Sequence, residues 1–164
     1  MKYVIAKHNN SAVFATVPQA GADSLRDFCK KQDIPCSGYR PTHALTTINS
    51  SENVIVVLRN PYQRYESGMQ FLSIGNNLKS MYIEQHTSLY LEEFKNKKIR
   101  YILFDKLSEY FPLDSDPEMI VPIKDYPEVY PNGELDEELE TYNHIIENNK
   151  ELTVKEFNQL MGIV

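Results

Sequence analysis

Residues 53–58 read Asn-Val-Ile-Val-Val-Leu, and this run constrains the fold more than any other part of the chain. It is apolar and β-branched from Val54 onward, which is typical of a central parallel strand covered on both faces. The strand is expected to stop just before Asn60 and Pro61. Asn60 suits a helix cap and Pro61 suits the first helical position, so a helix is predicted from Pro61 to about Leu72.

Other segments extend this alternation of strand and helix. Strands are predicted in Lys-Tyr-Val-Ile-Ala and Ser-Ala-Val-Phe-Ala-Thr-Val, on either side of a polar turn, and at 99–104. Apolar spacing or a capping box predicts helices at 24–32, around 79–96, around 107–111, at 135–146 and from Thr153 to Gly162. In the helix at 135–146, one apolar face is predicted to consist of Leu135, Leu139, Tyr142 and Ile146. Prolines and Gly38 indicate an irregular stretch at 35–41, and 112–133 is expected to be mostly loop. The sequence therefore predicts one α/β domain over 1–164, with three layers and a largely parallel sheet flanked by helices.

The segment Val-Pro-Gln-Ala-Gly-Ala-Asp-Ser-Leu at 17–25 has the layout of a strand, a glycine turn and a helix. Gly21 allows a close approach of the backbone, and the N–H groups from Ala22 to Leu25 would face outward where the helix dipole favours an anion. No Gly-Lys-Ser/Thr follows, so the Walker pattern is not matched. The segment is either a phosphate site or a helix start that Asp23 or Ser24 merely caps.

A second candidate lies at the end of the central strand. Ligands of open parallel sheets bind beyond the carboxyl ends of the strands, so the guanidinium of Arg59 is expected to emerge at that edge. Arg64 and Ser67 follow on one face of the predicted helix. An arginine fork with a hydroxyl suits a phosphate dianion. The alternative is that Arg59 and Arg64 pair with carboxylates such as Glu66 or Asp105.

Together the two segments resemble those of the sulfotransferases that use 3′-phosphoadenosine 5′-phosphosulfate (PAPS), especially the carbohydrate-type members. The family's first motif, Pro-Lys-x-Gly-x-x-Ser-Leu, binds the 5′-phosphosulfate, and this chain matches it at Pro18, Gly21, Ser24 and Leu25. The second motif, Arg-Asp/Asn-Pro-x-x-Arg-x-x-Ser, binds the 3′-phosphate, and the chain matches it at Arg59, Asn60, Pro61, Arg64 and Ser67. The resemblance covers about residues 12–111.

The resemblance implies a P-loop-like sulfotransferase fold and transfer of a sulfuryl group from PAPS to a hydroxyl of a carbohydrate or small-molecule acceptor. The product would be 3′-phosphoadenosine 5′-phosphate. The positions that would hold the nucleotide are Gln19, Ala20, Gly21, Ala22, Asp23, Ser24, Leu25, Arg59 and Ser67.

Two positions depart from the family pattern. Gln19 stands where the family has a lysine, and its amide donates a hydrogen bond but brings no positive charge. Loss of a preorganised donor at a developing charge costs about a hundredfold or more in rate. Asp23 stands where a threonine or serine is usual. The chain is therefore predicted to be a sulfotransferase or a catalytically impaired nucleotide-binding protein on the same fold; a P-loop kinase and a purely structural interaction protein are more distant alternatives.

The acceptor hydroxyl needs a base, which in related carbohydrate sulfotransferases is a histidine or glutamate between the two motifs. His43 is the one histidine in that interval. Its near-neutral pKa suits it to accept the proton, and Gln19 would act beside it on the sulfuryl donor. The alternative is that His43 is a surface or structural residue. No cluster has metal-ligand spacing, and direct transfer to a hydroxyl requires no metal.

Composition limits the partners. Acidic residues outnumber basic ones, 23 to 17, and the net charge of −6 disfavours nucleic acid and anionic membranes. The apolar run Val54–Leu58 is too short to span a bilayer and no signal peptide is indicated, so a cytoplasmic location is expected. Cys29 and Cys36 are expected to be reduced thiols, with a disulfide as the alternative. The sequence does not determine the oligomeric state.

Overall fold

The computed structural model of the protein describes residues 3–9, 11–15, 22–39, 46–47, 49–64, 91, 94–111 and 134–163. Its strands are β1 (Tyr3–His8), β2 (Ser11–Ala15), β3 (Cys36–Tyr39), β4 (Asn53–Leu58), β5 (Arg100–Leu103) and β6 (Lys150–Glu151). The helices described from end to end are α1 (Ala22–Gln32), α6 (Leu107–Tyr110), α7 (Glu134–Asn148) and α8 (Val154–Leu160), with a 3-10 turn, η1 (Phe104–Lys106), before α6.

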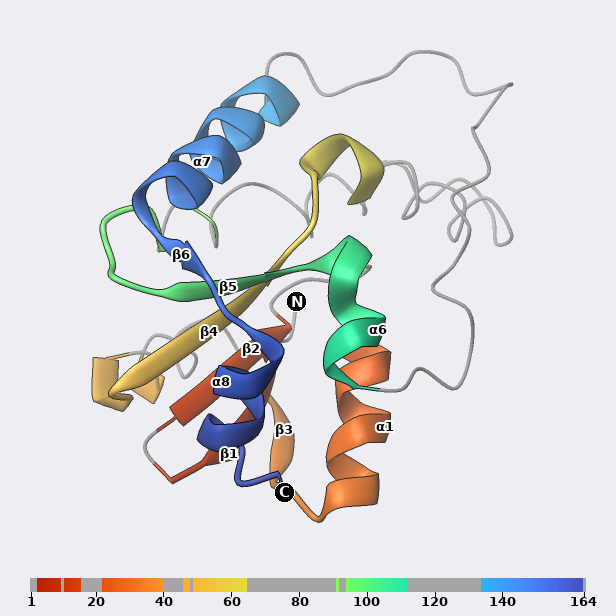
Figure 1. The fold of residues 1–164 in the computed structure, drawn as a ribbon. Helices are drawn as coiled ribbons and strands as arrows, with labels where there is room; N and C mark the ends of the chain where they lie inside the picture. Colours follow the sequence, from red (N-terminus) through yellow and green to blue (C-terminus); the bar gives the residue numbers. More distant parts are fainter. Residues whose placement is uncertain are drawn as a thin grey trace, which may run out of the picture.

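The strands form one sheet in the order β3-β1-β2-β4-β5-β6, shown in Figure 1. β2, β4, β5 and β6 pair parallel to one another, whereas β1 pairs antiparallel with both β2 and β3. Among the described strands, β1 alone therefore runs against the others. The predicted α/β class, with a largely parallel sheet flanked by helices, is confirmed at this level.

β4 lies between β2 and β5, and every residue from Val54 to Leu58 is buried. Its side chains alternate between two apolar clusters: Val54, Val56 and Leu58 belong to one, and Ile55 and Val57 to the other. Successive side chains of a strand point to opposite faces, so these clusters lie on the two faces of the sheet. The prediction of a central strand covered on both sides is confirmed.

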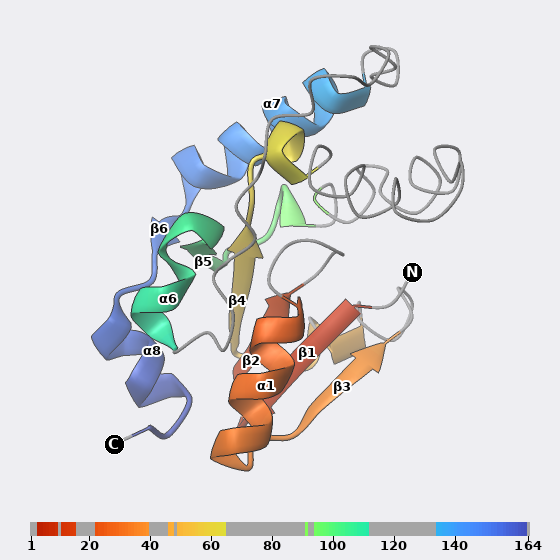
Figure 2. The same cartoon turned by 90° about the vertical axis from the view of Figure 1, so that its right-hand side faces the viewer.

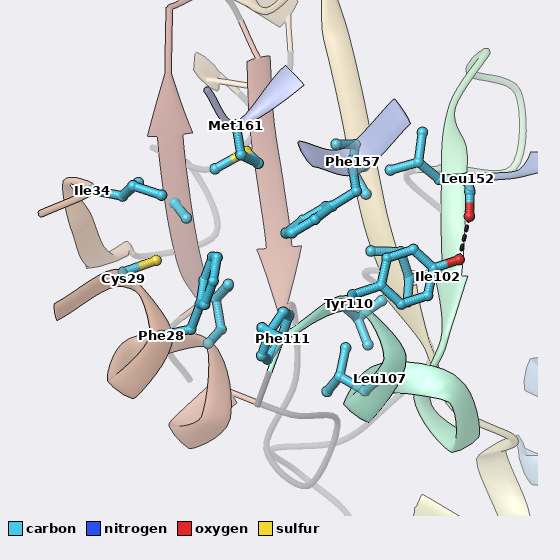
Figure 3. Packing of buried hydrophobic residues seen from close by; sticks show 14 residues of the cluster. Phe28, Cys29, Ile34, Ile102, Leu107, Tyr110, Phe111, Leu152, Phe157 and Met161 are labelled. Atoms are coloured by element: carbon cyan, nitrogen blue, oxygen red, sulfur yellow. Dashed lines mark hydrogen bonds between the residues drawn. The ribbon is translucent and has the colours of Figure 1, made fainter. Parts of the chain in front are cut away.

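Helices cover each face. On the Val56 face, Ile145 of α7 joins Leu91 and Phe94 over the strands. On the Ile55 face, α1, α6 and α8 supply the aromatic centre of the cluster shown in Figure 3. Phe28 of α1 stacks on Phe111 with ring centroids 4.8 Å apart, and Tyr110 meets Phe157 of α8 edge-on at 5.7 Å. The buried residues that close this face are Leu25, Phe28, Cys29, Leu107, Tyr110, Phe111, Leu152, Phe157 and Met161.

Local sequence signals set several helix ends as predicted. The Asn60 side chain accepts a hydrogen bond of 2.9 Å from the Tyr62 N–H, and the Arg64 N–H bonds to the Asn60 carbonyl, so a helix does begin at Pro61. Thr153 and Glu156 form the reciprocal capping box of α8. The prediction that this helix ends at Gly162 is confirmed, because Gly162 adopts φ of 68° just beyond the helix.

One expectation was wrong and another was incomplete. The stretch expected to be irregular contains β3, because its backbone pairs along the edge of β1 from Tyr3↔Tyr39 to Ala6↔Cys36. In α7 the helix is confirmed, and Tyr142 and Ile146 of the predicted apolar face pack against the core. Leu139, Tyr142 and Ile146 are half-buried, and among the α7 side chains that the structure describes, Glu138, Thr141 and Ile145 are buried more deeply. The end of the helix from Pro61 and most of the helix expected at 79–96 lie outside the described residues.

Candidate functional site

The two motif segments follow neighbouring strands of the sheet. β2 and β4 pair in parallel, with Phe14 opposite Val56. Since parallel strands end at the same edge, β2 and β4 both end at one edge of the sheet, with Arg59 directly after β4; Figure 2 shows these strands from the side. This is the edge at which parallel α/β sheets bind ligands.

The first segment is described from Ala22 onward. α1 begins at Ala22, so the N–H groups of Ala22, Asp23 and Ser24 belong to the first turn, which lacks acceptors within the helix. Ser24 is half-buried, whereas the Leu25 side chain is completely buried in the core. Only the backbone of Leu25 remains for a ligand. Gln19, Ala20, Gly21, His43 and Ser67 lie outside the described residues, so their roles stay predictions.

Arg59 lies directly beyond β4, but its guanidinium does not emerge into solvent as expected. The residue is 3% exposed, and its Cζ lies 4.1 Å from the centroid of the Phe104 ring. Leu58 and Leu103 are the last register pair of β4 and β5, so Arg59 and Phe104 follow as the next residues of two adjacent strands. The guanidinium therefore stacks on the ring, a contact worth about 2 kcal/mol when it is desolvated.

Arg64 forms a buried ion pair with Glu138 of α7. Each side chain is 2% exposed, and an Arg64 Nη2 hydrogen donates to a Glu138 carboxylate oxygen. Nearby, the Tyr62 hydroxyl donates to the Asp136 carboxylate. Two successive contacts therefore hold the first turn of α7 against the turn Pro61–Arg64 (Figure 2). The alternative of a carboxylate partner is confirmed for Arg64, whose partner among the described residues is Glu138.

Sequence reasoning missed Phe104, Asp136 and Glu138. Phe104 was treated only as the end of an apolar strand. Glu138 was overlooked because the apolar residues of α7 were taken to define its buried face. The sequence did hold a signal for the buried face of α7, because Glu138, Thr141 and Ile145 share one helical face at spacings of three and four. A buried arginine also requires a counter-charge, which Glu138 can supply.

The groups at this edge that are chemically suited to bind an anion are the arginine guanidinium and the N–H groups at the start of α1. The Nε and Nη2 atoms of Arg59 are inaccessible to solvent. An anion can therefore reach this guanidinium only after the neighbouring groups have moved. Arg64 donates from Nη2 to Glu138, so one arm of its guanidinium is already engaged by a carboxylate. Within the part of the chain that the structure describes, no group of three or more His, Cys, Asp or Glu side chains is arranged to hold a metal ion.

Comparisons with known proteins add no assignment. No protein-family model, curated protein or solved structure matches the chain. Among the described helices, none combines the length and the apolar character needed to cross a membrane.

Proposed function

We propose that the protein binds 3′-phosphoadenosine nucleotides at the carboxyl edge of β2 and β4 and transfers the sulfuryl group of PAPS to a hydroxyl of a carbohydrate or small-molecule acceptor. The proposal includes the finer fold assignment, a P-loop-like sulfotransferase domain. A single observation carries it: the two sequence segments that resemble the family's phosphate motifs follow adjacent parallel strands. Segments so placed can contact opposite ends of one ligand.

In this proposal each part of the site has a distinct role. The N–H groups at the start of α1, with Gln19 and Gly21, hold the 5′-phosphosulfate, and Arg59 with Ser67 holds the 3′-phosphate. His43 removes the proton from the acceptor hydroxyl. PAPS, when bound, supplies the sulfuryl group and a bisphosphorylated leaving group. The cation at Arg59 fits an anionic ligand, but its burial means that binding must uncover it.

A second candidate is a nucleotide-binding protein without turnover. Three features favour it: Gln19 replaces the family's lysine, Asp23 adds a negative charge beside the anion site, and Glu138 already engages Arg64. This protein would bind the same nucleotide, so the two candidates separate only in a rate measurement.

The first experiment measures nucleotide binding by thermal shift and calorimetry. 3′-Phosphoadenosine 5′-phosphate is compared with AMP and ATP, which lack the 3′-phosphate. Ligand at about one hundred times its Kd contributes about 2.7 kcal/mol, which raises the Tm of a domain of this size by about 5–10 °C. A rise with the bisphosphate alone supports the proposal. An equal rise with ATP, or no rise with any nucleotide, refutes it.

Variants then locate the site. Arg59→Lys keeps the charge but loses the two-pronged fork, so its Kd for the bisphosphate is expected to rise about tenfold or more. Lys30→Ala is the control, because it removes an exposed positive charge from the last turn of α1. Equal affinity of Arg59→Lys and the parent protein would show that Arg59 does not hold the 3′-phosphate. Release of 3′-phosphoadenosine 5′-phosphate from PAPS, with and without Gln19→Lys, separates the enzyme from the binding protein.

A further inference from the structure

The protein contains two cysteines, and the fold brings them together across a tight reversal of the chain. Cys29 lies near the end of α1, and Cys36 is the first residue of β3. Asp33 adopts φ of 55°, and the Ile34 N–H donates a hydrogen bond of 2.9 Å to the carbonyl of Cys29 itself. This is the long bond of a Schellman turn, so the chain doubles back beside the residue that carries the first thiol.

Pairing with β1 fixes the second thiol on the returning chain. The Lys7 N–H donates to the Pro35 carbonyl at 3.0 Å, and Cys36 lies opposite Ala6 in the register of β1 and β3. Cys36 packs against the cluster that contains Cys29 and Ile34, and Figure 3 shows Cys29 and Ile34 at one end of that cluster. The positions of both cysteines thus follow from the backbone as well as from side-chain packing.

The two thiols differ in their surroundings. Cys29 is 1% exposed, whereas Cys36 is partly open to solvent. The hydrogen bond between them raises the pKa of Cys29, and burial raises it further. The same hydrogen bond lowers the pKa of Cys36, and the charge of Arg26 adds to this effect against the opposing effect of burial. An accessible, acidic thiol beside a second cysteine is the arrangement found in thiols that sense oxidants.

We propose that Cys36 and Cys29 form an oxidation-sensitive dithiol, in which Cys36 reacts with a hydroperoxide and Cys29 then closes an intramolecular disulfide between α1 and β3. This site is separate from the proposed nucleotide site and does not depend on it. Both cysteines are reduced in the structure, which is the starting state of the reaction.

Written for hydrogen peroxide as the oxidant, the reaction balances. The Cys36 thiolate attacks a peroxide oxygen, an S–O bond forms, the O–O bond breaks, and the departing hydroxide takes a proton to become water. The Cys29 sulfur then attacks the Cys36 sulfenic acid. An S–S bond forms, the S–O bond breaks, and the Cys29 proton leaves with the hydroxyl as a second water. Two thiols are oxidised and one peroxide is reduced; a dithiol reductant reverses the change.

The test treats the reduced full chain with hydrogen peroxide, quenches it in acid and measures its intact mass and its thiol content. Because the chain has two cysteines, loss of two hydrogen atoms from a monomer together with loss of both thiols identifies the Cys29–Cys36 disulfide without ambiguity. Dithiothreitol should restore both thiols. A dimer of twice the mass, or a monomer that gains oxygen and keeps its second thiol, would overturn the proposal.

Single variants assign the two roles. Cys29→Ala is expected to stop at a Cys36 sulfenic acid, which dimedone traps, whereas Cys36→Ala should leave the buried Cys29 unreacted at the same peroxide dose. The pH dependence of the rate of Cys36 alkylation by iodoacetamide reports the pKa of this thiol, which a purely structural role would leave unchanged. Its midpoint should lie below that of an ordinary thiol and rise in Cys29→Ala. Peroxide reaction at Cys29 in Cys36→Ala, or an unchanged midpoint, would contradict the assignment.

Discussion

Replacing Glu138 with glutamine tests how the turn Pro61–Arg64 is held against α7. Glutamine keeps the shape of the side chain and removes its charge, so the buried Arg64 guanidinium loses the charge of the carboxylate that it contacts there. Removing one member of a buried ion pair costs about 3–5 kcal/mol, because the remaining charge stays in a medium that solvates it poorly. That is a large share of the total stability of about 5–15 kcal/mol expected of a domain.

The measurement is urea unfolding followed by far-UV circular dichroism, since the chain has no tryptophan for fluorescence. The expected loss corresponds to a Tm lowered by about 6–20 °C. The matched control is Glu151→Gln, which makes the same chemical change in an exposed pair. Glu151 lies 3.1 Å from Lys106, and the two side chains are 33% and 47% exposed. Solvent screens such a pair, so its loss is expected to cost about 0–1 kcal/mol.

A double variant separates charge from packing. Arg64→Met with Glu138→Leu replaces the pair by apolar side chains of similar size, and it should recover most of the stability that Glu138→Gln loses. The reasoning is refuted if Glu138→Gln costs no more than Glu151→Gln. It is also refuted if the double variant is as unstable as the single one, because uncompensated charge would then not be the cause.

Three further outcomes are expected. Gly162→Ala should lower the free energy of unfolding in urea by about 1–2 kcal/mol or more, because Gly162 has φ of 68° and a Cβ there would lie 2.5 Å from Nε2 of His8. Adding His8→Ala should recover only the part of this loss that the clash causes. The hydrogen bond to Arg100 lowers the pKa of Glu156 to about 2. The contribution of the ionised Glu156 to folding stability is therefore complete above the unfolded pKa of about 4.3 and is lost as the pH falls toward 2. In an acid-unfolding series, Glu156→Gln should remove this part of the pH dependence of the stability. Asn60→Ala should cost about 1 kcal/mol in thermal unfolding, because it removes the cap of the helix that follows Arg59, and a cost near zero would show that the cap is dispensable.

The elements predicted correctly from sequence are those that neighbouring residues determine. The apolar run of β4 indicates burial on both faces wherever the strand pairs, and the Asn60-Pro61 dipeptide starts a helix by local hydrogen bonding. β3 was missed because Gly38 and the flanking prolines disfavour a strand locally, whereas pairing with β1 creates one. The pattern of local propensities carries no information about that partner.

The candidate site shows the same division. The position of Arg59 at the end of β4 could be predicted, because it follows from the strand boundary alone. Its stacking on Phe104 depends on the register of β4 with β5. The burial of Glu138 depends on Arg64, which lies 74 positions earlier in the chain. Contacts at such separation have no signature in the spacing of nearby residues, so the structure was needed to find them.

The cover on the Ile55 face has a consequence for synthesis of the protein. Leu152, Phe157 and Met161 close that face, and all three come after the last described strand, β6, in the chain. A ribosome therefore exposes β4 and β5 for some time before α8 emerges to shield them. During that interval the growing chain presents Ile55, Val57 and Ile102 to water, where transiently exposed apolar surface invites aggregation or chaperone capture.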